Sequence, residues 1–198
     1  MAPERVHPAL RHRVLVLVGL MGSGKSTVGP LIADRVGLPF ADLDALIEAS
    51  TGHTIRDLIV TEGENAFRAI ESEVLADALS GPPVVLATGG GAVGDPRSRQ
   101  LLTDGPVVVW LQAPVGTLVE RVGGVGAAGR PLLDEGPVEV LTRLETERAP
   151  LYAEVAAISI ETGHDTPDGV AASVVDALDQ MVDDGADLMA GAEDGERP

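Results

Sequence analysis

Residues 14–26 read VLVLVGLMGSGKS, and this stretch decides the fold. Val14 to Val18 is an apolar, β-branched run with the length of one buried strand. The run from Gly19 to Ser26 has the spacing G-x-x-x-x-G-K-S, in which glycines let backbone N–H groups converge on phosphate oxygens. A helical pattern follows at once, so its positive N-terminal end faces the same anion. The stretch therefore predicts a strand, a phosphate-binding loop and a helix.

Two side chains of this loop have separate predicted tasks. Lys25 would reach the β- and γ-phosphates of a nucleotide, and the Ser26 hydroxyl would take a Mg²⁺ position. The chain has 14 basic residues, of which Lys25 is the only lysine. Its compact ammonium therefore stands at the position where a point charge is needed to bind phosphate. The alternative is a glycine-rich strand-to-helix turn that binds no ligand.

Composition limits the class of protein. A length of 198 residues favours one domain, and a net charge of −17 disfavours binding to a nucleic-acid backbone. With no cysteine there is no disulfide framework and no thiolate metal site. Since no apolar run reaches about 18 residues, we expect a soluble, cytoplasmic protein that does not enter a membrane.

Predicted strands alternate with predicted helices, as in an α/β domain with a parallel sheet. The predicted strands are 13–18, 38–43, 84–87, 107–111 and 157–161. Two predicted helices end near residues 36 and 51. The other predicted helices span 55–61, 64–79, 95–103, 115–122, 137–148 and 167–182. Pro30 predicts a local irregularity in the first helix, because it lacks the N–H that would bond the carbonyl of Ser26. We expect 1–12 to be a flexible lead, 13–182 to be the single domain and 183–198 to be a disordered acidic tail.

Three motifs lie at the carboxyl ends of predicted strands. They are the phosphate loop, Asp42-Leu43-Asp44 and the triplet Gly89-Gly90-Gly91. Ligands of parallel α/β sheets bind at the carboxyl ends of the strands, so these motifs are expected to meet at one site.

Together the motifs resemble shikimate kinase, a family of small P-loop kinases of the nucleoside-monophosphate-kinase-like group. The resemblance runs from about residue 13 to 182. Besides the three motifs it rests on Phe67-Arg68 with Glu71, Arg130-Pro131-Leu132-Leu133 and Arg148-Ala149-Pro150-Leu151-Tyr152. It implies a P-loop NTPase fold with a five-stranded parallel sheet flanked by helices. It also implies an acceptor-binding lobe at about 44–79 and a lid at about 123–134.

The resemblance implies that ATP phosphorylates the 3-hydroxyl of shikimate with one Mg²⁺ per site, in aromatic amino acid biosynthesis. We also expect a monomer. Mg²⁺ would be held by Ser26 and, through water, by Asp42. Arg121 would pack on the adenine, and Arg130 on the lid would neutralise the transferring phosphoryl group. The implied nucleotide-binding residues are Gly22, Ser23, Gly24, Lys25, Ser26, Thr27, Arg121 and Arg130.

At the acceptor, the resemblance implies that Asp44 binds shikimate hydroxyls and orients the attacking one or accepts its proton. Arg68 and Arg148 would clamp the carboxylate, with Glu71 orienting Arg68. The implied substrate-binding residues are Asp44, Arg68, Gly89, Gly90, Gly91 and Arg148. The implied catalytic residues are Asp44, Lys25 and Arg130.

Each motif also has a plainer interpretation when taken alone. Arg68 with Glu71 has the spacing of an ordinary surface pair on a helix, and Asp44 could simply cap the helix that it begins. The triplet could be a turn, Arg130 a solvated lid charge, and Arg148 a partner of Glu145 or Glu147. For the whole chain, the alternatives are another small-molecule P-loop kinase, such as one for gluconate, and a nucleotide-binding module without turnover.

Overall fold

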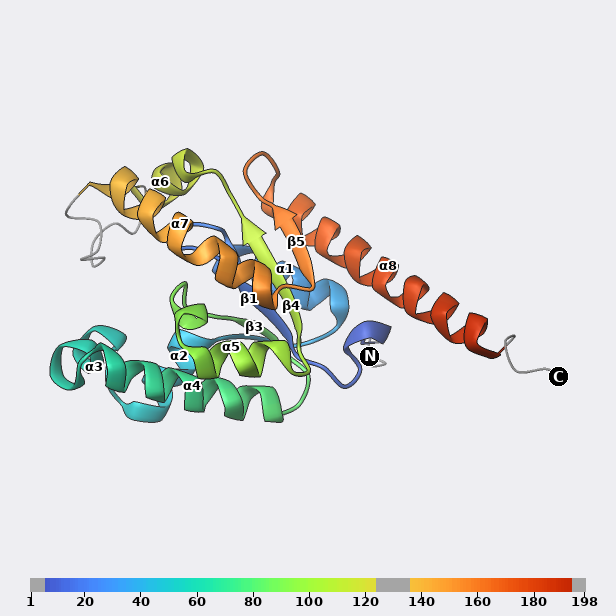
Figure 1. Ribbon diagram of the computed structural model, residues 1–198, viewed down its shortest axis with the longest axis horizontal. Helices are drawn as coiled ribbons and strands as arrows, with labels where there is room; N and C mark the ends of the chain where they lie inside the picture. The colour runs from blue at the N-terminus through green and yellow to red at the C-terminus, as the bar shows by residue number, and fades with distance from the viewer. Residues whose placement is uncertain (1–5, 124–135, 194–198) are drawn as a thin grey trace.

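The computed structural model describes residues 6–123 and 136–193 of the chain (Figure 1). The strands are β1 (Leu15–Val18), β2 (Phe40–Asp42), β3 (Val85–Ala87), β4 (Val107–Gln112) and β5 (Ile158–Glu161). The helices are α1 (Lys25–Val36), α2 (Leu43–Thr51), α3 (Ile55–Glu62), α4 (Glu64–Ser80), α5 (Pro96–Thr103), α6 (Val115–Gly123), α7 (Pro137–Val155) and α8 (Pro167–Glu193). Two short 3₁₀ turns are η1 (Pro8–Leu10) and η2 (Ala92–Gly94).

The five strands form one parallel sheet in the order β2-β3-β1-β4-β5. In the central register, Val16 of β1 lies beside Leu86 of β3 and Val108 of β4. Neighbouring parallel strands need crossover connections, and the helices between them supply these. The predicted five-stranded parallel sheet is confirmed, and the carboxyl ends of its strands lie along one edge.

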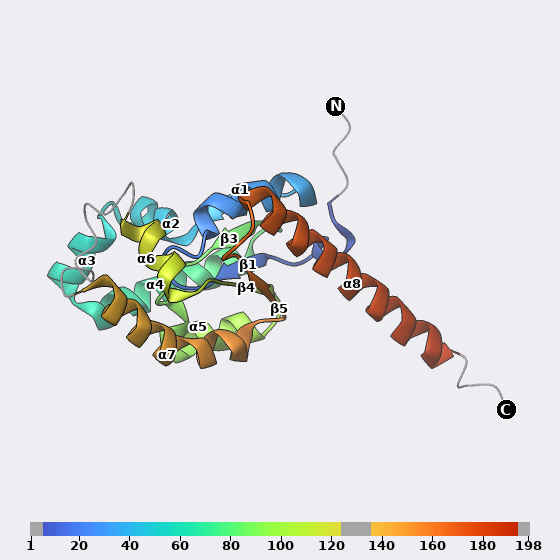
Figure 2. The same ribbon diagram turned by 90° about the horizontal axis from the view of Figure 1, so that it is seen from above.

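The side chains of β1 alternate between two apolar clusters, one on each face of the sheet. Leu15 and Leu17 pack into the cluster that α1 and α8 cover, whereas Val16 and Val18 pack into the cluster covered by α2 and α4 to α7. Figure 2 shows α1 with α8 on one side of the sheet and α5 with α7 on the other. A strand buried on both faces reads as a continuous apolar run, which is why β1 was visible in the sequence.

Helix α1 begins directly after the phosphate loop. Its N-cap, Gly24, has φ 102°, and its C-cap, Gly37, has φ 71° and donates its N–H to Ala33 O. Both positions need the left-handed backbone that glycine adopts without steric cost. The irregularity predicted at Pro30 does not interrupt the helix, which is anchored on both sides of it by the buried residues Val28 and Ile32.

Residues 6–12 are not the flexible lead that the sequence predicts. The ring of His7 bonds Asp179 of α8 at 3.0 Å, its backbone N–H donates to Val36 O at 3.0 Å, and Leu10 is fully buried. The apolar side chains of this segment pack between the C-terminal end of α1 and the middle of α8. Only the folded structure reveals this packing.

Two helices are longer than predicted. Helix α7 continues from Arg148 through Pro150 to Val155, because it buries Tyr152 and Val155. Burying each large apolar side chain contributes about 1.5–3 kcal/mol, which offsets the cost of about 3 kcal/mol for proline inside a helix. Helix α8 continues past residue 182 to residue 193, so 183–193 is helical rather than structureless, and it projects beyond the body of the molecule (Figure 1). Alanine, leucine and methionine in this segment propagate a helix that is already formed.

Among the helices of residues 6–123 and 136–193, none combines the length and the apolar character that crossing a bilayer requires.

The packing of α1 on β2 gives a first prediction. A methyl group at Gly29 would overlap the ring of Phe40. Alanine is favoured over glycine in a helix by about 1 kcal/mol, but overpacking costs about 1–3 kcal/mol. Gly29→Ala should therefore lower the free energy of unfolding in urea by about 1 kcal/mol. Gly116→Ala in α6, where nothing lies within 4 Å of the added methyl, should raise it instead. Equal effects of the two substitutions would show that Gly29 is not tightly packed.

Candidate active site

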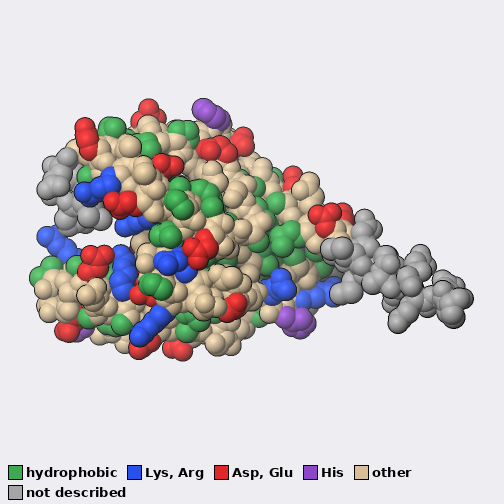
Figure 3. Space-filling model, in the orientation of Figure 1, with side chains coloured by type: hydrophobic (Ala, Val, Ile, Leu, Met, Phe, Trp, Pro, Cys, Tyr) green, Lys and Arg blue, Asp and Glu red, His purple; other side chains and the backbone are tan. Residues whose placement is uncertain are grey.

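The three motifs predicted to meet do so at the carboxyl edge of the sheet. The phosphate loop follows β1, Asp42 ends β2, and the glycine triplet follows β3. These strands are hydrogen-bonded neighbours in the order β2-β3-β1, so the sheet itself holds the motifs together. Figure 3 shows a cleft at the end of the molecule where α3 and α7 lie, with Lys and Arg side chains along it.

The phosphate loop depends on glycines at two points of close approach. Gly19 has φ 141°, and a Cβ there would overlap the carbonyl of Leu111 on β4. Gly22 has φ 81°, and a Cβ there would lie 2.9 Å from a methyl of Val122 on α6. The loop is therefore packed against β4 and α6 through its own backbone.

Lys25 folds back over the loop that precedes it. Its Nζ donates to Gly19 O at 2.6 Å, to Leu20 O at 3.0 Å and to Ser23 Oγ at 3.4 Å. The residue is only 8% exposed. The ammonium is thus positioned at the loop, and Thr27 is the third residue of α1.

Asp42, and not Asp44, caps α2. The Oδ1 of Asp42 accepts the backbone N–H of Asp44 at 3.0 Å, and its Oδ2 accepts the hydroxyl of Ser26 at 3.4 Å. The alternative in which Asp44 is the helix cap is therefore wrong. Asp42 links the start of α2 to the phosphate loop, while the Asp44 side chain takes no part in capping.

Two carboxylates converge on Gly89. A Cβ at Gly89 would lie 3.0 Å from Asp44 Oδ1 and 3.1 Å from Glu71 Oε1. Burial, and then the neighbouring Asp42 carboxylate, raise the pKa of Asp44, while Lys25 lowers it. Burial also raises the pKa of Glu71. The Glu71 Oε1 atom is buried and has no hydrogen-bond partner among the described residues.

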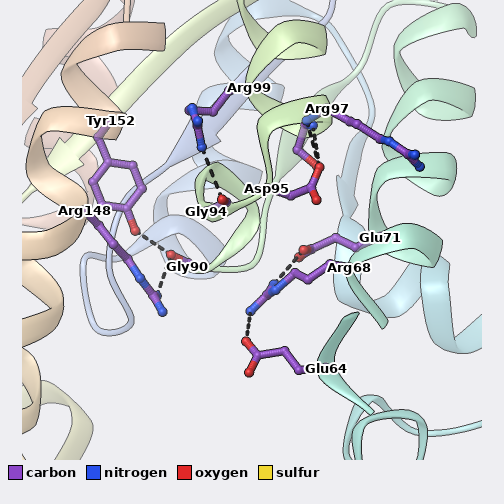
Figure 4. Close-up of polar contacts among 11 residues, drawn as sticks. Glu64, Arg68, Glu71, Gly90, Gly94, Asp95, Arg97, Arg99, Arg148 and Tyr152 are labelled. Carbon is purple, nitrogen blue, oxygen red and sulfur yellow. Dashed lines mark hydrogen bonds and ion pairs between the residues drawn. The ribbon is translucent and has the colours of Figure 1, made fainter. Parts of the chain in front are cut away.

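Arg68 is held by two acidic side chains of its own helix (Figure 4). Its Nη1 donates to Glu71 Oε2 at 2.6 Å, and its Nη2 donates to Glu64 Oε1 at 3.3 Å. The Glu71 side chain is 1% exposed, whereas that of Glu64 is 71% exposed. Arg68 with Glu71 is therefore not an ordinary surface pair, and its guanidinium lies against the backbone of Gly91.

Arg148 approaches the glycine triplet from the opposite side, as Figure 4 shows. Its Nη1 donates to Gly90 O at 2.8 Å, and the Tyr152 hydroxyl donates to the same oxygen at 2.6 Å. Among the described residues it forms no ion pair with Glu145 or Glu147, so that alternative is wrong.

Arg121 joins the phosphate loop to the end of β5. It donates to Gly22 O at 3.3 Å, to Thr162 Oγ1 at 3.0 Å and to Thr162 O at 2.6 Å. The Thr162 hydroxyl in turn donates to Ser23 O at 3.2 Å. Arg130, and the predicted lid apart from Gly123, lie outside the described residues.

Two residues of this arrangement were given no role from the sequence. Tyr152 belongs to the motif that begins at Arg148, but its contact with Gly90 spans 62 positions. Thr162 bonds Ser23 across 139 positions. No local pattern contains such contacts, although the position of Tyr152 one helical turn after Arg148 is a signal that could have been used.

The shikimate kinase family model matches residues 21–179. The shikimate kinase of Paramagnetospirillum magneticum is 45% identical over 183 residues, covering 90% of this chain and 92% of that protein. That of Symbiobacterium thermophilum is 44% identical over 167 residues, covering 84% and 96%. The chain belongs to the shikimate kinase family. It is a phosphotransferase of the shikimate pathway that uses ATP as co-substrate.

The fold of this chain also matches solved structures. A shikimate kinase from Acinetobacter baumannii in complex with shikimate matches with a TM-score of 0.79 and 39% identity, covering 84% of this chain and 92% of that one. A gluconokinase from Sinorhizobium meliloti shares the fold, with a TM-score of 0.66 at 19% identity and coverage of 93% and 99%.

The raised pKa of Asp44 predicts how stability depends on pH. A carboxyl group whose folded pKa lies above its ordinary value of 3.8 stabilises the fold fully below that value, and this contribution is lost as pH rises through the folded pKa. Asparagine stays neutral, so the stability of Asp44→Asn relative to the wild type should rise with pH from 3 upward and then level off. Urea unfolding of the ligand-free proteins across this pH range measures it.

Asp34→Asn, at an exposed position on α1, is the matched control. One effect acts in the opposite direction. Asp44 lies in the first turn of α2, where an ionised carboxylate stabilises the helix by about 0.3–1 kcal/mol. A wild type that becomes more stable than Asp44→Asn as pH rises would show that the helix end dominates and that the pKa is not raised.

Proposed function

We propose that this chain transfers the γ-phosphoryl group of ATP to the 3-hydroxyl of shikimate, with one Mg²⁺, as a monomer. The observation that carries the proposal is the placement of Arg68 and Arg148 on the two sides of Gly90, beside the phosphate loop (Figure 4). Two guanidinium forks suit one carboxylate, and shikimate is a hydroxylated carboxylic acid. The relative from A. baumannii was solved with shikimate. The monomer is part of the proposal, because the proposed site needs no residue from a second copy of the chain.

At the nucleotide end, the phosphate loop offers backbone N–H groups and the start of α1 to the phosphates. We assign Lys25 to the β- and γ-phosphates, because its ammonium already lies over the loop that would hold them. Arg121 is assigned to the adenine, since Thr162 and Gly22 fix its guanidinium next to the loop. Arg130 is assigned to the transferring phosphoryl group from the family motif alone.

Ser26 and Asp42 fit a Mg²⁺ ion. A hydroxyl and a carboxylate are hard oxygen donors, and in this structure they already lie 3.4 Å apart. The described residues contain no group of three or more His, Cys, Asp or Glu side chains that could hold a metal. That fits an ion which completes its shell with water and nucleotide phosphates. Bound here, Mg²⁺ would neutralise charge on the β- and γ-phosphate oxygens.

At the acceptor, the shikimate carboxylate would sit between Arg68 and Arg148, with its hydroxyls toward Asp44 and the N–H groups of Gly90 and Gly91. The 3-hydroxyl oxygen attacks the γ-phosphorus, and the bond from that phosphorus to the β–γ bridging oxygen breaks. ADP leaves with that electron pair. The hydroxyl proton passes to Asp44, whose raised pKa makes it a stronger base than an ordinary aspartate.

The test is ADP release measured separately with shikimate, gluconate and AMP as acceptor. We expect release that depends on shikimate and on Mg²⁺, and only background release with the other two. Arg68→Ala should raise KM for shikimate about a hundredfold with little change in KM for ATP, because a charge-assisted contact is worth about 1.5–3 kcal/mol. Faster turnover of gluconate would identify a different small-molecule kinase. ATP binding without release for any acceptor would identify a non-catalytic nucleotide-binding module.

Arg97→Ala is the matched control for Arg68→Ala. Arg97 lies at the start of α5 and is exposed, with its guanidinium directed away from Arg68 and Arg148 in Figure 4. Its removal should leave KM for shikimate within about twofold. If both arginine variants raise KM equally, the effect is a general loss of positive charge, and Arg68 does not bind the carboxylate.

A further inference from the structure

The carbonyl oxygen of Gly90 has two donors, and both come from α7. Tyr152 Oη lies 2.6 Å from it and Arg148 Nη1 lies 2.8 Å from it. A carbonyl oxygen has two lone pairs, so these two bonds saturate it. The two side chains are four residues apart on one helix and reach the same atom from one face.

The two donors differ in their freedom to move. Tyr152 is 1% exposed, and its ring packs against that of Trp110 on β4 at a centroid distance of 5.6 Å. Arg148 is only half-buried, and it carries a long side chain that can take several rotamers. Burial raises the pKa of Tyr152 to about 12, so its hydroxyl remains a donor at any physiological pH.

Binding of the acceptor makes this difference matter. A guanidinium has five N–H donors, so the outcome is set by the edge that binds the carboxylate. If Arg148 clamps a carboxylate with its Nη1–Nη2 edge, Nη1 turns toward the carboxylate and its bond to Gly90 O is weakened or lost. A partly buried carbonyl left without a donor destabilises the bound state.

We infer that Tyr152 is a positioning residue, which holds the Gly90 carbonyl by itself when Arg148 turns to the carboxylate of the acceptor. This inference rests on the proposed function, because it needs an acceptor with a carboxylate at Arg148. The tyrosine hydroxyl lowers the free-energy cost of moving Arg148, because Gly90 O keeps one donor. Without that hydroxyl, Gly90 O loses its remaining donor when Arg148 turns to the carboxylate of the acceptor.

Tyr152→Phe tests the inference, because it removes the hydroxyl and leaves the ring packed on Trp110. We expect kcat/KM for shikimate to fall about tenfold, with KM for ATP and the thermal unfolding temperature nearly unchanged. The decisive comparison is a double-mutant cycle with Arg148→Ala. Since Arg148→Ala has no arginine to release, adding Tyr152→Phe to it should change kcat/KM by less than about twofold.

The ratio kcat/KM is obtained from the initial slope of rate against shikimate concentration, so it can be measured for variants that do not reach saturation. A second arm uses the methyl ester of shikimate, which has no carboxylate to draw Arg148 away from Gly90. The tenfold penalty of Tyr152→Phe should vanish for the ester, and this arm needs no Arg148 variant.

An equal loss from Tyr152→Phe in both backgrounds, or for both acceptors, would overturn the inference and leave Tyr152 with a structural role only. Wild-type activity of Tyr152→Phe would overturn it as well. Failure of the proposed function gives a different result, namely no turnover of shikimate by the wild-type chain.

Discussion

The backbone of Gly90 lies directly against the backbone of the phosphate loop, and no side chain separates them. A Cβ at Gly90 would lie 3.3 Å from Gly19 O and 3.4 Å from Met21 N. This contact joins the loop that would hold the nucleotide to the loop that would face the acceptor. Because phosphoryl transfer depends on positioning more than on covalent chemistry, the spacing of these two loops is the constraint on which the site rests.

Positive charge is concentrated at this contact in a chain whose net charge is −17. Arg148 and Arg121 donate mainly to carbonyl oxygens, which orient a guanidinium without neutralising it. Among the described residues, neither forms an ion pair. Arg68 is the exception, since it is held by the buried Glu71. Anionic substrates are therefore attracted by local groups that act against the field of the whole chain.

Sequence patterns predicted the parts of this arrangement that local rules determine. The apolar run before Gly19, the spacing of the phosphate loop and the order of the motifs along the chain were enough for the sheet and its carboxyl edge. They were not enough for the cap of α2, because Asp42 and Asp44 are equally suited to it until the path of the chain is known. The contact of Tyr152 with Gly90 and the packing of Leu10 under α8 join distant segments, so no local pattern contains them. The same reason explains α7, whose buried Tyr152 and Val155 outweigh the signal of Pro150 to end the helix.

The turnover number of Gly90→Ala with both substrates at saturation tests most directly whether backbone contact sets the geometry of the site. The added methyl must push the loop that contains Gly90 away from Gly19 and Met21 by a few tenths of an ångström, and a misplacement of about 1 Å can cost about a hundredfold in rate. We therefore expect kcat to fall about three- to tenfold for Gly90→Ala and to stay unchanged for Gly94→Ala, where the methyl meets nothing within 4 Å. A Gly90→Ala enzyme that turns over at the wild-type rate would contradict this expectation.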